Sequence, residues 1–205
     1  MLIGPKYKIA RRVGAPVFEK TQSQKFALSE DRKMKARGRK RGRAKSDFGL
    51  QLNEKQKARY VYGLSEKQFR NYVLEAIAQK KVPSSQYLYS KLERRIDNIV
   101  YRAGLASTRR LARQIVSHGH IMVNGRRITI PSHILTSKDT FKVRPQSQTS
   151  KLFTNLAETT AERTMPNWLI FDIGKFEGSI KDDPQLKEAQ DLLFNLNTII
   201  EFYSK

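Results

Sequence analysis

The chain has 205 residues, of which 40 are lysine or arginine and 19 are aspartate or glutamate, so its formal net charge at pH 7 is +21. A charge of this size favours polyanionic partners, while the absence of cysteine excludes disulfides and thiolate metal sites. The N-terminal segment MLIGPKYKIARR contains no long apolar run, so we expect neither a secretory signal nor contact with a membrane.

The charge is distributed unevenly along the chain. Residues 1–45 contain 15 basic and 3 acidic side chains, residues 46–145 contain 19 and 7, and residues 146–205 contain 6 and 9. A chain that is basic only for solubility would spread its charge more evenly. We therefore interpret the part before residue 146 as facing a polyanion and the acidic remainder as facing something else.

Residues 1–45 show little hydrophobic periodicity. The run KMKARGRKRGRAK (33–45) places glycines among nearly continuous lysine and arginine, which repel one another too strongly to form a packed element. We interpret residues 1–45 as a basic N-terminal arm that becomes ordered only on phosphate backbones, with a permanently disordered arm as the alternative. Few apolar residues of this arm are expected to join a core.

A helical pattern begins after the arm. One helix is predicted over NEKQKARYVYG, with Asn53 as a possible cap and Gly63 at its end. The next begins with a capping box of Ser65 and Gln68, and a short helix follows Pro83. The apolar positions of the second helix repeat with helical spacing: Phe69, Tyr72, Val73, Ala76 and Ile77.

Two further helices are predicted over KLERRIDNIVYRAG and STRRLARQIVSHGH, each with a single apolar face. Gly104 and Gly119 are expected to end them. Ser90 with Glu93 should form a capping box for the first helix, and Ser107 should cap the second.

The segment IMVNGRRITI predicts a β-hairpin with Asn124-Gly125 in a type I′ turn, where positive φ is needed at both positions. Further strands are predicted at 140–144 and within 168–180. The C-terminal segment keeps helical spacing at Leu192, Leu193, Leu196, Ile199, Ile200 and Tyr203.

These elements predict an α+β protein. A mainly helical domain should span residues 46–91 and be completed by residues 190–205. An inserted RNA-binding module with its extension should span residues 92–189, with two helices packed on a small, mostly antiparallel sheet.

Arginines are concentrated in the second helix of this module. Arg109, Arg110 and Arg113 lie on one polar side with no acid nearby in the helix, and the hairpin adds Arg126 and Arg127 beside its turn. Guanidinium groups bind phosphate bidentately and stay charged, whereas a solvated helix face usually mixes signs. The pattern therefore predicts contact with RNA or DNA by arginines that the fold itself does not need.

The segment LERRIDNIVYRAGLASTRRLARQIVSHGHIMVNGRRITIPSHIL resembles the small RNA-binding module named after the ribosomal protein S-four family. Four segments outside the module resemble the same family: GPKYKIARR (4–12), SDFGLQLNEKQKARYVYGLSEKQFRNYVLEA (46–76), PNWLIFDIGKFEG (166–178) and IIEFYSK (199–205). Because it covers nearly the whole chain, the resemblance implies a bacterial-type ribosomal protein of this family.

The resemblance implies a structural constituent of the small ribosomal subunit, not an enzyme. The expected protein binds a multi-helix junction in the 5′ domain of small-subunit rRNA early in assembly, helps line the channel through which mRNA enters, and supports decoding accuracy. Expected partners are small-subunit rRNA, mRNA near that channel, and neighbouring ribosomal proteins, especially small-subunit protein five. The expected location is the bacterial cytoplasm, or an organelle that encodes its own copy.

No cofactor and no metal are expected. Many relatives carry zinc-binding cysteines near the N-terminus, and this chain has none. Its histidines are too few and too scattered to replace them, because His118 and His120 flank Gly119 and His133 stands alone.

The residues expected to bind RNA are the basic ones of the arm, the helical domain and the module, together with one histidine. They are Lys6, Lys8, Arg11, Arg12, Arg37, Arg39, Lys40, Arg41, Arg43, Lys45, Lys55, Lys57, Arg59, Lys67, Arg70, Arg94, Arg95, Arg109, Arg110, Arg113, His118, Arg126 and Arg127. The residues expected to contact another protein are Glu177, Asp182, Asp183, Phe202 and Tyr203.

The alternative is a stand-alone RNA-binding or RNA-modifying protein that carries the same module, such as a pseudouridine synthase or a tyrosyl-tRNA synthetase. The 60 residues after Pro145 are too few for a catalytic domain and contain no Gly-rich phosphate loop. Asp172 with Glu177, Asp182 and Asp183 could be read as paired carboxylates, but turn and strand-edge acids explain them better.

Overall fold

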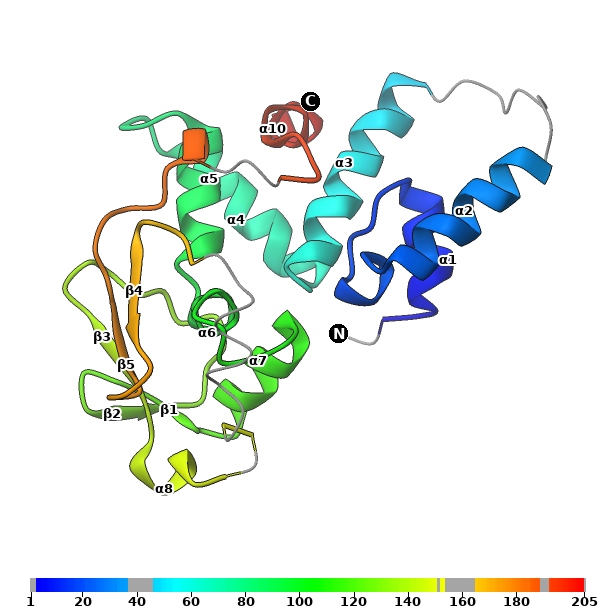
Figure 1. The fold of residues 1–205 in the computed structure, drawn as a ribbon. Coiled ribbons are helices and arrows are strands. Elements are labelled where there is room, and N and C mark those ends of the chain that lie inside the picture. The colour runs from blue at the N-terminus through cyan, green and yellow to red at the C-terminus, as the bar shows by residue number, and fades with distance from the viewer. Residues whose placement is uncertain (1–2, 37–45, 151, 154–164, 189–191, 205) are drawn as a thin grey trace. The chain divides into compact units, whose positions relative to one another are not determined.

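The computed structural model describes residues 3–36, 46–150, 152–153, 165–188 and 192–204. The chain divides into two compact units, one made of Met1–Leu88 with Ala189–Lys205 and the other of Tyr89–Glu188. The first unit is helical and the second combines helices with one sheet (Figure 1).

Two helices of the first unit begin at serine caps. Ser46 caps α3 (Asp47–Val61) by accepting a hydrogen bond from the backbone N–H of Gly49. Asn53, the predicted cap, instead lies within α3, and its side-chain amide donates to the carbonyl of Val13 at 2.9 Å. Ser65 caps α4 (Glu66–Ala78) by accepting from the backbone N–H of Gln68, which is one half of the predicted capping box. The side-chain amide of Gln68 donates to the Tyr72 hydroxyl at 3.3 Å.

The helix α5 (Ser84–Glu93) follows α4, and α10 (Leu196–Ser204) returns from the C-terminal end of the chain to pack on α3 and α4. Leu196 and Ile199 are buried in this contact, and the ring centres of Phe202 and Phe48 lie 5.5 Å apart. The predicted C-terminal helix is thus confirmed from Leu196 onward.

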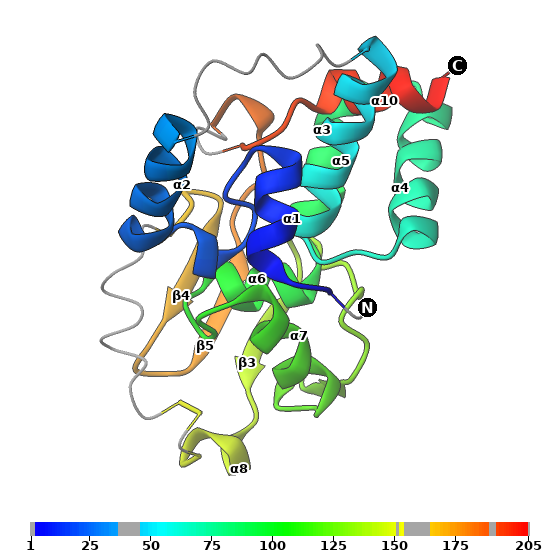
Figure 2. The ribbon, with the colours of Figure 1, turned by 90° about the vertical axis from the view of Figure 1, so that its right-hand side faces the viewer.

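The N-terminal residues differ from the prediction. They form α1 (Lys6–Val13), the 3-10 turn η1 (Glu19–Thr21) and α2 (Gln24–Ala36). Helices α1 and α3 lie side by side (Figure 2). The apolar cluster in this region consists of Ile9, Val13, Val17, Phe18 and Tyr60, with Tyr60 supplied by α3.

An arm that orders only on RNA is therefore wrong for residues 3–36, because its apolar residues do join a core. The stripe is short, Ile9, Ala10 and Val13 among basic neighbours, so a pattern search over the whole segment does not detect it. Gly14, at φ 72°, ends α1 in the left-handed conformation that favours glycine. Residues 37–45 of the predicted arm lie outside the described residues.

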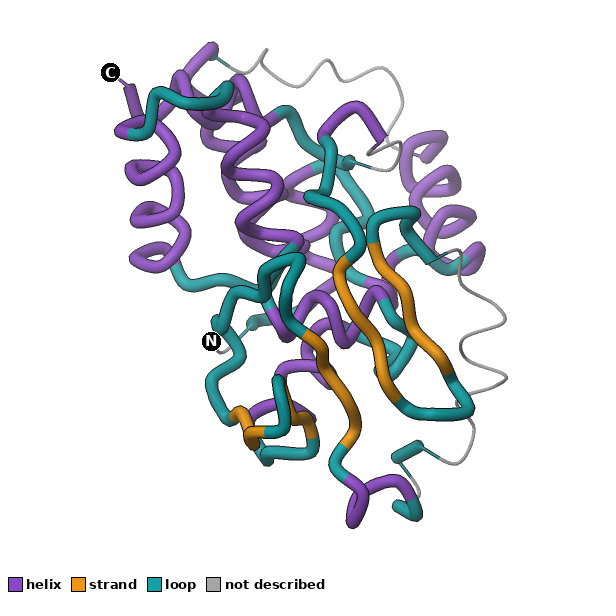
Figure 3. The backbone as a smooth tube through the Cα atoms, turned by 90° about the vertical axis from the view of Figure 1, so that its left-hand side faces the viewer, coloured by secondary structure: helices purple, strands orange, loops and turns teal. Residues whose placement is uncertain are grey.

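The second unit contains α6 (Ile96–Arg102), α7 (Arg109–Ser117) and a five-stranded antiparallel sheet. The strands are β1 (Ile121–Val123), β2 (Arg126–Ile128), β3 (Thr140–Val143), β4 (Leu169–Asp172) and β5 (Glu177–Ile180), in the order β2-β1-β3-β5-β4 (Figure 3). Two short helical segments, α8 (Pro145–Gln148) and η2 (Leu186–Glu188), follow β3 and β5. The predicted α+β class is confirmed.

The turn predictions in this unit are confirmed and the cap predictions are not. Asn124 and Gly125 both have positive φ, 48° and 78°, in the hairpin between β1 and β2. The cap of α7 is Thr108, one residue after the predicted Ser107. Ser90 and Glu93 form no capping box, because both lie inside α5 and α6 starts only after Arg95.

One apolar core joins the two helices of the second unit to the inner face of the sheet. Ile99 of α6, Ile115 of α7 and Phe141 of β3 are each at most 1% exposed. Phe141 packs closely on Gly178, where an added Cβ would come within 2.6 Å of the Phe141 ring. This core fixes the helices on the sheet and so positions the polar residues of α7 and the hairpin.

The N-terminal core yields the first prediction. Phe18→Ala should lower the free energy of unfolding of the first unit by about 3 kcal/mol, because it removes a buried aromatic ring from a small cluster. Urea unfolding of the full chain, followed by circular dichroism, measures the change. Lys8→Ala is the matched control, since Lys8 is exposed on the neighbouring α1. Equal stability of the two variants would mean that residues 3–36 contribute no core.

Candidate nucleic-acid interface

Exposed basic side chains gather on α7, at its C-terminal end and on the hairpin of the second unit. Arg110, Arg126 and Arg127 are exposed, as is His118. Arg127 donates from Nη2 to the carbonyl of His118 at 2.9 Å, which holds its guanidinium beside the end of α7. Within the described ranges, none of these arginines has an acidic partner. Their guanidinium groups are therefore accessible to a ligand from solvent.

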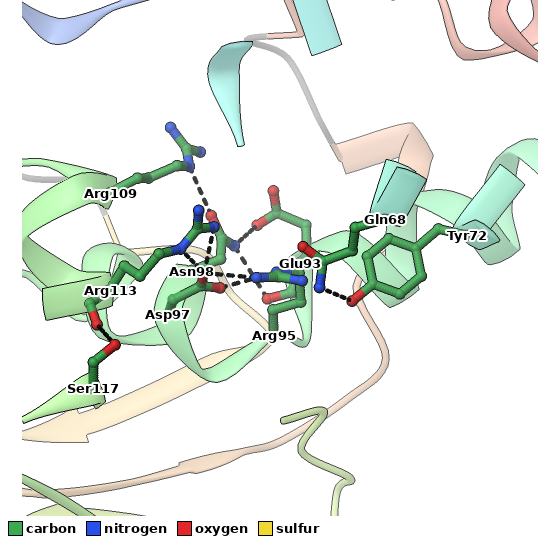
Figure 4. A network of polar contacts seen from close by, with 9 residues as sticks. All are labelled: Gln68, Tyr72, Glu93, Arg95, Asp97, Asn98, Arg109, Arg113 and Ser117. Atoms are coloured by element: carbon green, nitrogen blue, oxygen red, sulfur yellow. Dashed lines mark hydrogen bonds and ion pairs between the residues drawn. The ribbon is translucent and has the colours of Figure 1, made fainter. Parts of the chain in front are cut away.

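Two other arginines of α7 turn toward α6 instead of toward solvent (Figure 4). Arg113 donates from Nε and Nη2 to Oδ2 of Asp97 at 2.9 and 2.7 Å. Arg109 donates from Nε to Oδ1 of Asn98 at 2.8 Å, and its guanidinium lies 4.3 Å from the ring centre of Tyr101. The prediction that Arg109, Arg110 and Arg113 all face outward is therefore wrong. The acid that pairs with Arg113 belongs to another helix, so the sequence of α7 alone does not reveal it.

The prediction that Arg95 binds RNA is also wrong. It is 1% exposed, and its Nε and Nη2 donate to the carboxylate of Asp97 at 3.0 and 2.7 Å. Asp97 is itself 3% exposed, so a buried carboxylate is shared by the guanidiniums of Arg95 and Arg113. A charge this deeply buried is stable only when paired. Arg95 therefore serves the fold and is not accessible to RNA.

A related pairing surrounds Glu93, which is completely buried. Its carboxylate accepts two hydrogen bonds from Arg102, at 2.9 and 3.0 Å, and one from the side chain of Asn98 at 3.0 Å. Asn98 thus links Glu93 to Arg109 (Figure 4). Polar groups of α5, α6 and α7 form one connected network, which stabilises the arrangement of these helices.

Arg94 and Asp183 form an ion pair with each other. Arg94 donates from Nε to the carbonyl of Leu135 at 2.6 Å, and its Nη1 lies 3.0 Å from Oδ1 of Asp183. One predicted RNA-binding residue and one predicted protein-contact residue therefore form an ion pair within the unit. The other two predicted protein-contact acids, Glu177 and Asp182, are exposed.

In the first unit, Glu66 gathers several predicted site residues. It accepts hydrogen bonds from Lys55 at 2.7 Å, Arg59 at 2.6 Å and the Tyr203 hydroxyl at 2.9 Å. Burial raises the pKa of Glu66, but these hydrogen bonds outweigh it and hold that pKa below its usual value. The Lys55 ammonium also lies 4.7 Å from the ring centre of Phe202.

This cluster corrects the assignment of Lys55 as an RNA-binding residue, because it is 8% exposed and occupied inside the unit. Phe202 and Tyr203 are half-buried in the same cluster and so serve the fold first.

The other predicted basic residues of the first unit fall into two groups. Four have internal partners: Arg11 pairs with Glu30, Lys57 with Glu54, Arg12 contacts the Tyr60 hydroxyl, and Lys6 lies over the ring of Phe18. Three are exposed, namely Lys8, Lys67 and Arg70. The predicted residues Arg37, Arg39, Lys40, Arg41, Arg43 and Lys45 lie outside the described residues.

One feature was not predicted from the sequence. A pocket of about 340 Å³ is lined by Met122, Arg127, Arg144, Pro145 and Gln146. Of these, only Arg127 was a predicted site residue. The two-residue hairpin turn pairs Met122 with Arg127, so the turn type alone could have placed these two side chains together.

His120 lies near this pocket, and its Nδ1 is 3.0 Å from the Ser147 hydroxyl. Burial and the neighbouring positive charges of His118, Arg144 and Arg127 lower the pKa of His120. It therefore stays neutral to lower pH than an ordinary histidine.

Two classes of site have no counterpart in the described part of the chain. It contains no group of three or more histidine, aspartate or glutamate side chains that could hold a metal ion. Its helices are all too short or too polar to cross a membrane.

The network around Asp97 yields the second prediction. Arg113→Gln should lower the free energy of unfolding by about 2 kcal/mol, because it removes charge-assisted hydrogen bonds to a buried carboxylate. Arg110→Gln, on the exposed side of the same helix, should change it by less than about 0.5 kcal/mol. Thermal unfolding of both variants tests the difference. Equal effects would contradict the assignment of Arg113 to the fold.

Comparison with known proteins identifies both parts of the chain. Residues 1–93 match the ribosomal protein S4/S9 N-terminal domain, and residues 94–141 match the S4 domain. Small ribosomal subunit protein uS4 of Aquifex aeolicus is 39% identical over 207 residues, covering 99% of this chain and 98% of the relative. The proteins of the same name from Persephonella marina and Hahella chejuensis are 41% and 42% identical, and each alignment covers at least 98% of both chains. The chain belongs to the uS4 family of small ribosomal subunit proteins.

Proposed function

We propose that the chain is a structural component of the small ribosomal subunit that binds its rRNA. The observation that carries this proposal is the set of exposed arginines Arg110, Arg126 and Arg127 on a rigid module, in a chain related to uS4 proteins over nearly its whole length. Phosphate contacts by guanidinium groups supply affinity and orientation without a chemical step. A catalytic role has no comparable support.

Early binding during assembly is the finer part of this proposal. The chain would recognise a multi-helix junction in the 5′ domain of the rRNA. A protein that binds bare rRNA first must fold without help from other subunit components. In support, each unit carries an apolar core and exposed basic residues of its own, such as Lys67 and Arg70 in the first and Arg110 in the second.

The arginine-rich run at residues 37–45 is assigned to the channel through which mRNA enters. This assignment rests on the sequence and on the family resemblance. A dense positive charge there would contact the mRNA backbone whatever the sequence of the mRNA, because every sequence has the same phosphates.

The edge of the sheet formed by β5 and β4 carries Glu177 and Asp172 and is its acidic end. We assign this end to contact with a neighbouring protein, with small-subunit protein five as the candidate. That contact would support decoding accuracy. RNA repels exposed carboxylates such as those of Glu177 and Asp182. A basic protein surface would be attracted to them. The cellular location would be that of the ribosome, in the bacterial cytoplasm or in an organelle that encodes its own copy.

The alternative is a stand-alone RNA-binding protein with the same module. Sedimentation of cell extracts through a high-salt sucrose gradient distinguishes the two. A structural component should remain with intact small subunits, whereas a stand-alone factor should dissociate as its phosphate contacts are screened.

The third prediction concerns salt dependence. Arg110→Gln and Arg126→Gln should each reduce the slope of log affinity against log salt for 5′-domain rRNA by about 0.7–0.9, because each removes one phosphate contact. Lys175→Gln is the control, since Lys175 is exposed at the acidic end of the sheet near Asp172. Filter binding at several salt concentrations measures the slopes. Unchanged slopes in both arginine variants would mean that these side chains face solvent in the complex.

The fourth prediction concerns the acids. Glu177→Lys with Asp182→Lys should leave the affinity for 5′-domain rRNA in physiological salt within about twofold, because neither carboxylate is assigned to RNA. Binding of purified small-subunit protein five should weaken in the same variant. Asp183 is left unchanged, since its reversal would break the ion pair with Arg94. A several-fold change in rRNA affinity would contradict the separation of an RNA surface from a protein surface.

A further inference from the structure

The outward face of the sheet changes sign from one end to the other. Side chains that pair directly across strands lie on the same face. The register places Arg127 of β2, Met122 of β1 and Lys142 of β3 in one row, which continues through Glu177 of β5 to Asp172 of β4. The row is therefore cationic at the hairpin end and anionic at the β4 edge.

The pocket lies at the cationic end of this row. Met122 and Pro145 supply apolar lining, Gln146 supplies an amide, and the guanidiniums of Arg127 and Arg144 supply planar, charged groups. Neighbouring strands are about 4.8 Å apart, so β5 lies about 10 Å from β1. That separation exceeds the Debye length of about 8 Å at physiological salt. The acids of β5 and β4 thus leave the attraction of Arg127 for anions largely intact, whereas Arg144, which follows β3, lies nearer to β5.

The guanidinium group of each arginine in the pocket donates a hydrogen bond to an acceptor within the unit. Arg127 donates to the carbonyl of His118, and its guanidinium lies directly against Gly119. An added Cβ at Gly119 would clash with Nε of Arg127, so the glycine leaves the room that this side chain occupies. Arg144 donates from Nε to Oε1 of Gln146 at 2.6 Å. Each guanidinium thus has a hydrogen-bond partner within the unit that favours the orientation seen at the pocket.

We propose that this pocket binds one unstacked nucleobase of single-stranded RNA, with the adjoining phosphate on Arg127 or Arg144. The inference rests on the proposed rRNA-binding function and adds a subsite to it. Every base offers a flat face that stacks on a guanidinium plane or an apolar side chain. The phosphate next to it satisfies the charge of the same arginines. A duplex keeps its bases stacked and would not present one to the pocket.

The test uses the full chain labelled with ¹³C at its methionine methyl groups, with the Met122 signal assigned from a Met122→Leu variant. The probes are a short oligoadenylate and an abasic oligoribonucleotide with the same number of phosphates. A base in the pocket lies close to the Met122 methyl, so its ring current should shift that signal. The abasic probe should leave the signal nearly unchanged and should bind about tenfold more weakly, which is typical of the loss of one stacked base.

Variants that keep the charge separate stacking from simple electrostatics. Arg127→Lys and Arg144→Lys should each reduce the preference for oligoadenylate over the abasic probe, because lysine lacks the planar face. Arg126→Lys is the matched control. Its register partner Val123 is buried, so Arg126 lies on the opposite face of the same strand and does not line the pocket. Arg126→Lys keeps the charge of the phosphate contact assigned to Arg126, so any change in affinity should affect both probes equally and leave their ratio unchanged.

The outcomes distinguish this inference from the function on which it rests. Equal binding and equal methyl shifts with both probes would overturn the base pocket and leave backbone contacts, so the rRNA-binding function would stand. A silent Met122 methyl, together with 5′-domain rRNA binding that Arg110→Gln weakens, would also overturn it and favour a protein side chain as the occupant. Failure of 5′-domain rRNA to bind the unaltered chain would contradict the proposed function and this inference with it.

Discussion

The buried carboxylate of Asp97 is the interaction on which the second unit depends. Moving an ion of this size out of water costs several kcal/mol, and only close, well-oriented partners offset that cost. Arg95 supplies one partner from the residue before α6, and Arg113 supplies the other from α7. The carboxylate thus joins the two helices by charge as well as by their apolar seam.

The same region is tied through its backbone to the segment between β2 and β3. The N–H of Ile96 donates to the carbonyl of His133 at 2.8 Å, and the N–H of Leu135 donates to the carbonyl of Arg94 at 3.0 Å. Helix α6 is therefore anchored to the segment that leads into β3, while α7 is anchored to α6. The exposed Arg110 on α7 consequently has a fixed place relative to the hairpin that carries Arg126 and Arg127.

What could be predicted from the sequence follows from local rules. The Asn124-Gly125 turn and the Ser65 cap depend on a few adjacent residues, and both were predicted. The pairing of Arg113 with Asp97 depends on which helix packs beside α7, which no spacing within one helix reveals. Helix α1 was not predicted, because its short apolar stripe lies among lysines and arginines. The net charge therefore overstates the number of basic residues available to RNA, since Arg95 and Lys55 are buried inside the fold.

The division of arginines between the interior and the surface has a consequence for binding. Guanidinium stays charged whether buried or exposed, so the interior arginines need carboxylates and the surface ones remain available for phosphate. Both ends of α7 are fixed, by the Thr108 cap at its start and by Gly119, at φ 73°, just beyond its end. Side chains on such a scaffold lose less conformational freedom on binding than those of a flexible arm. The internal ion pairs thereby favour the proposed RNA binding, because they preorganise the surface that is proposed to contact the RNA.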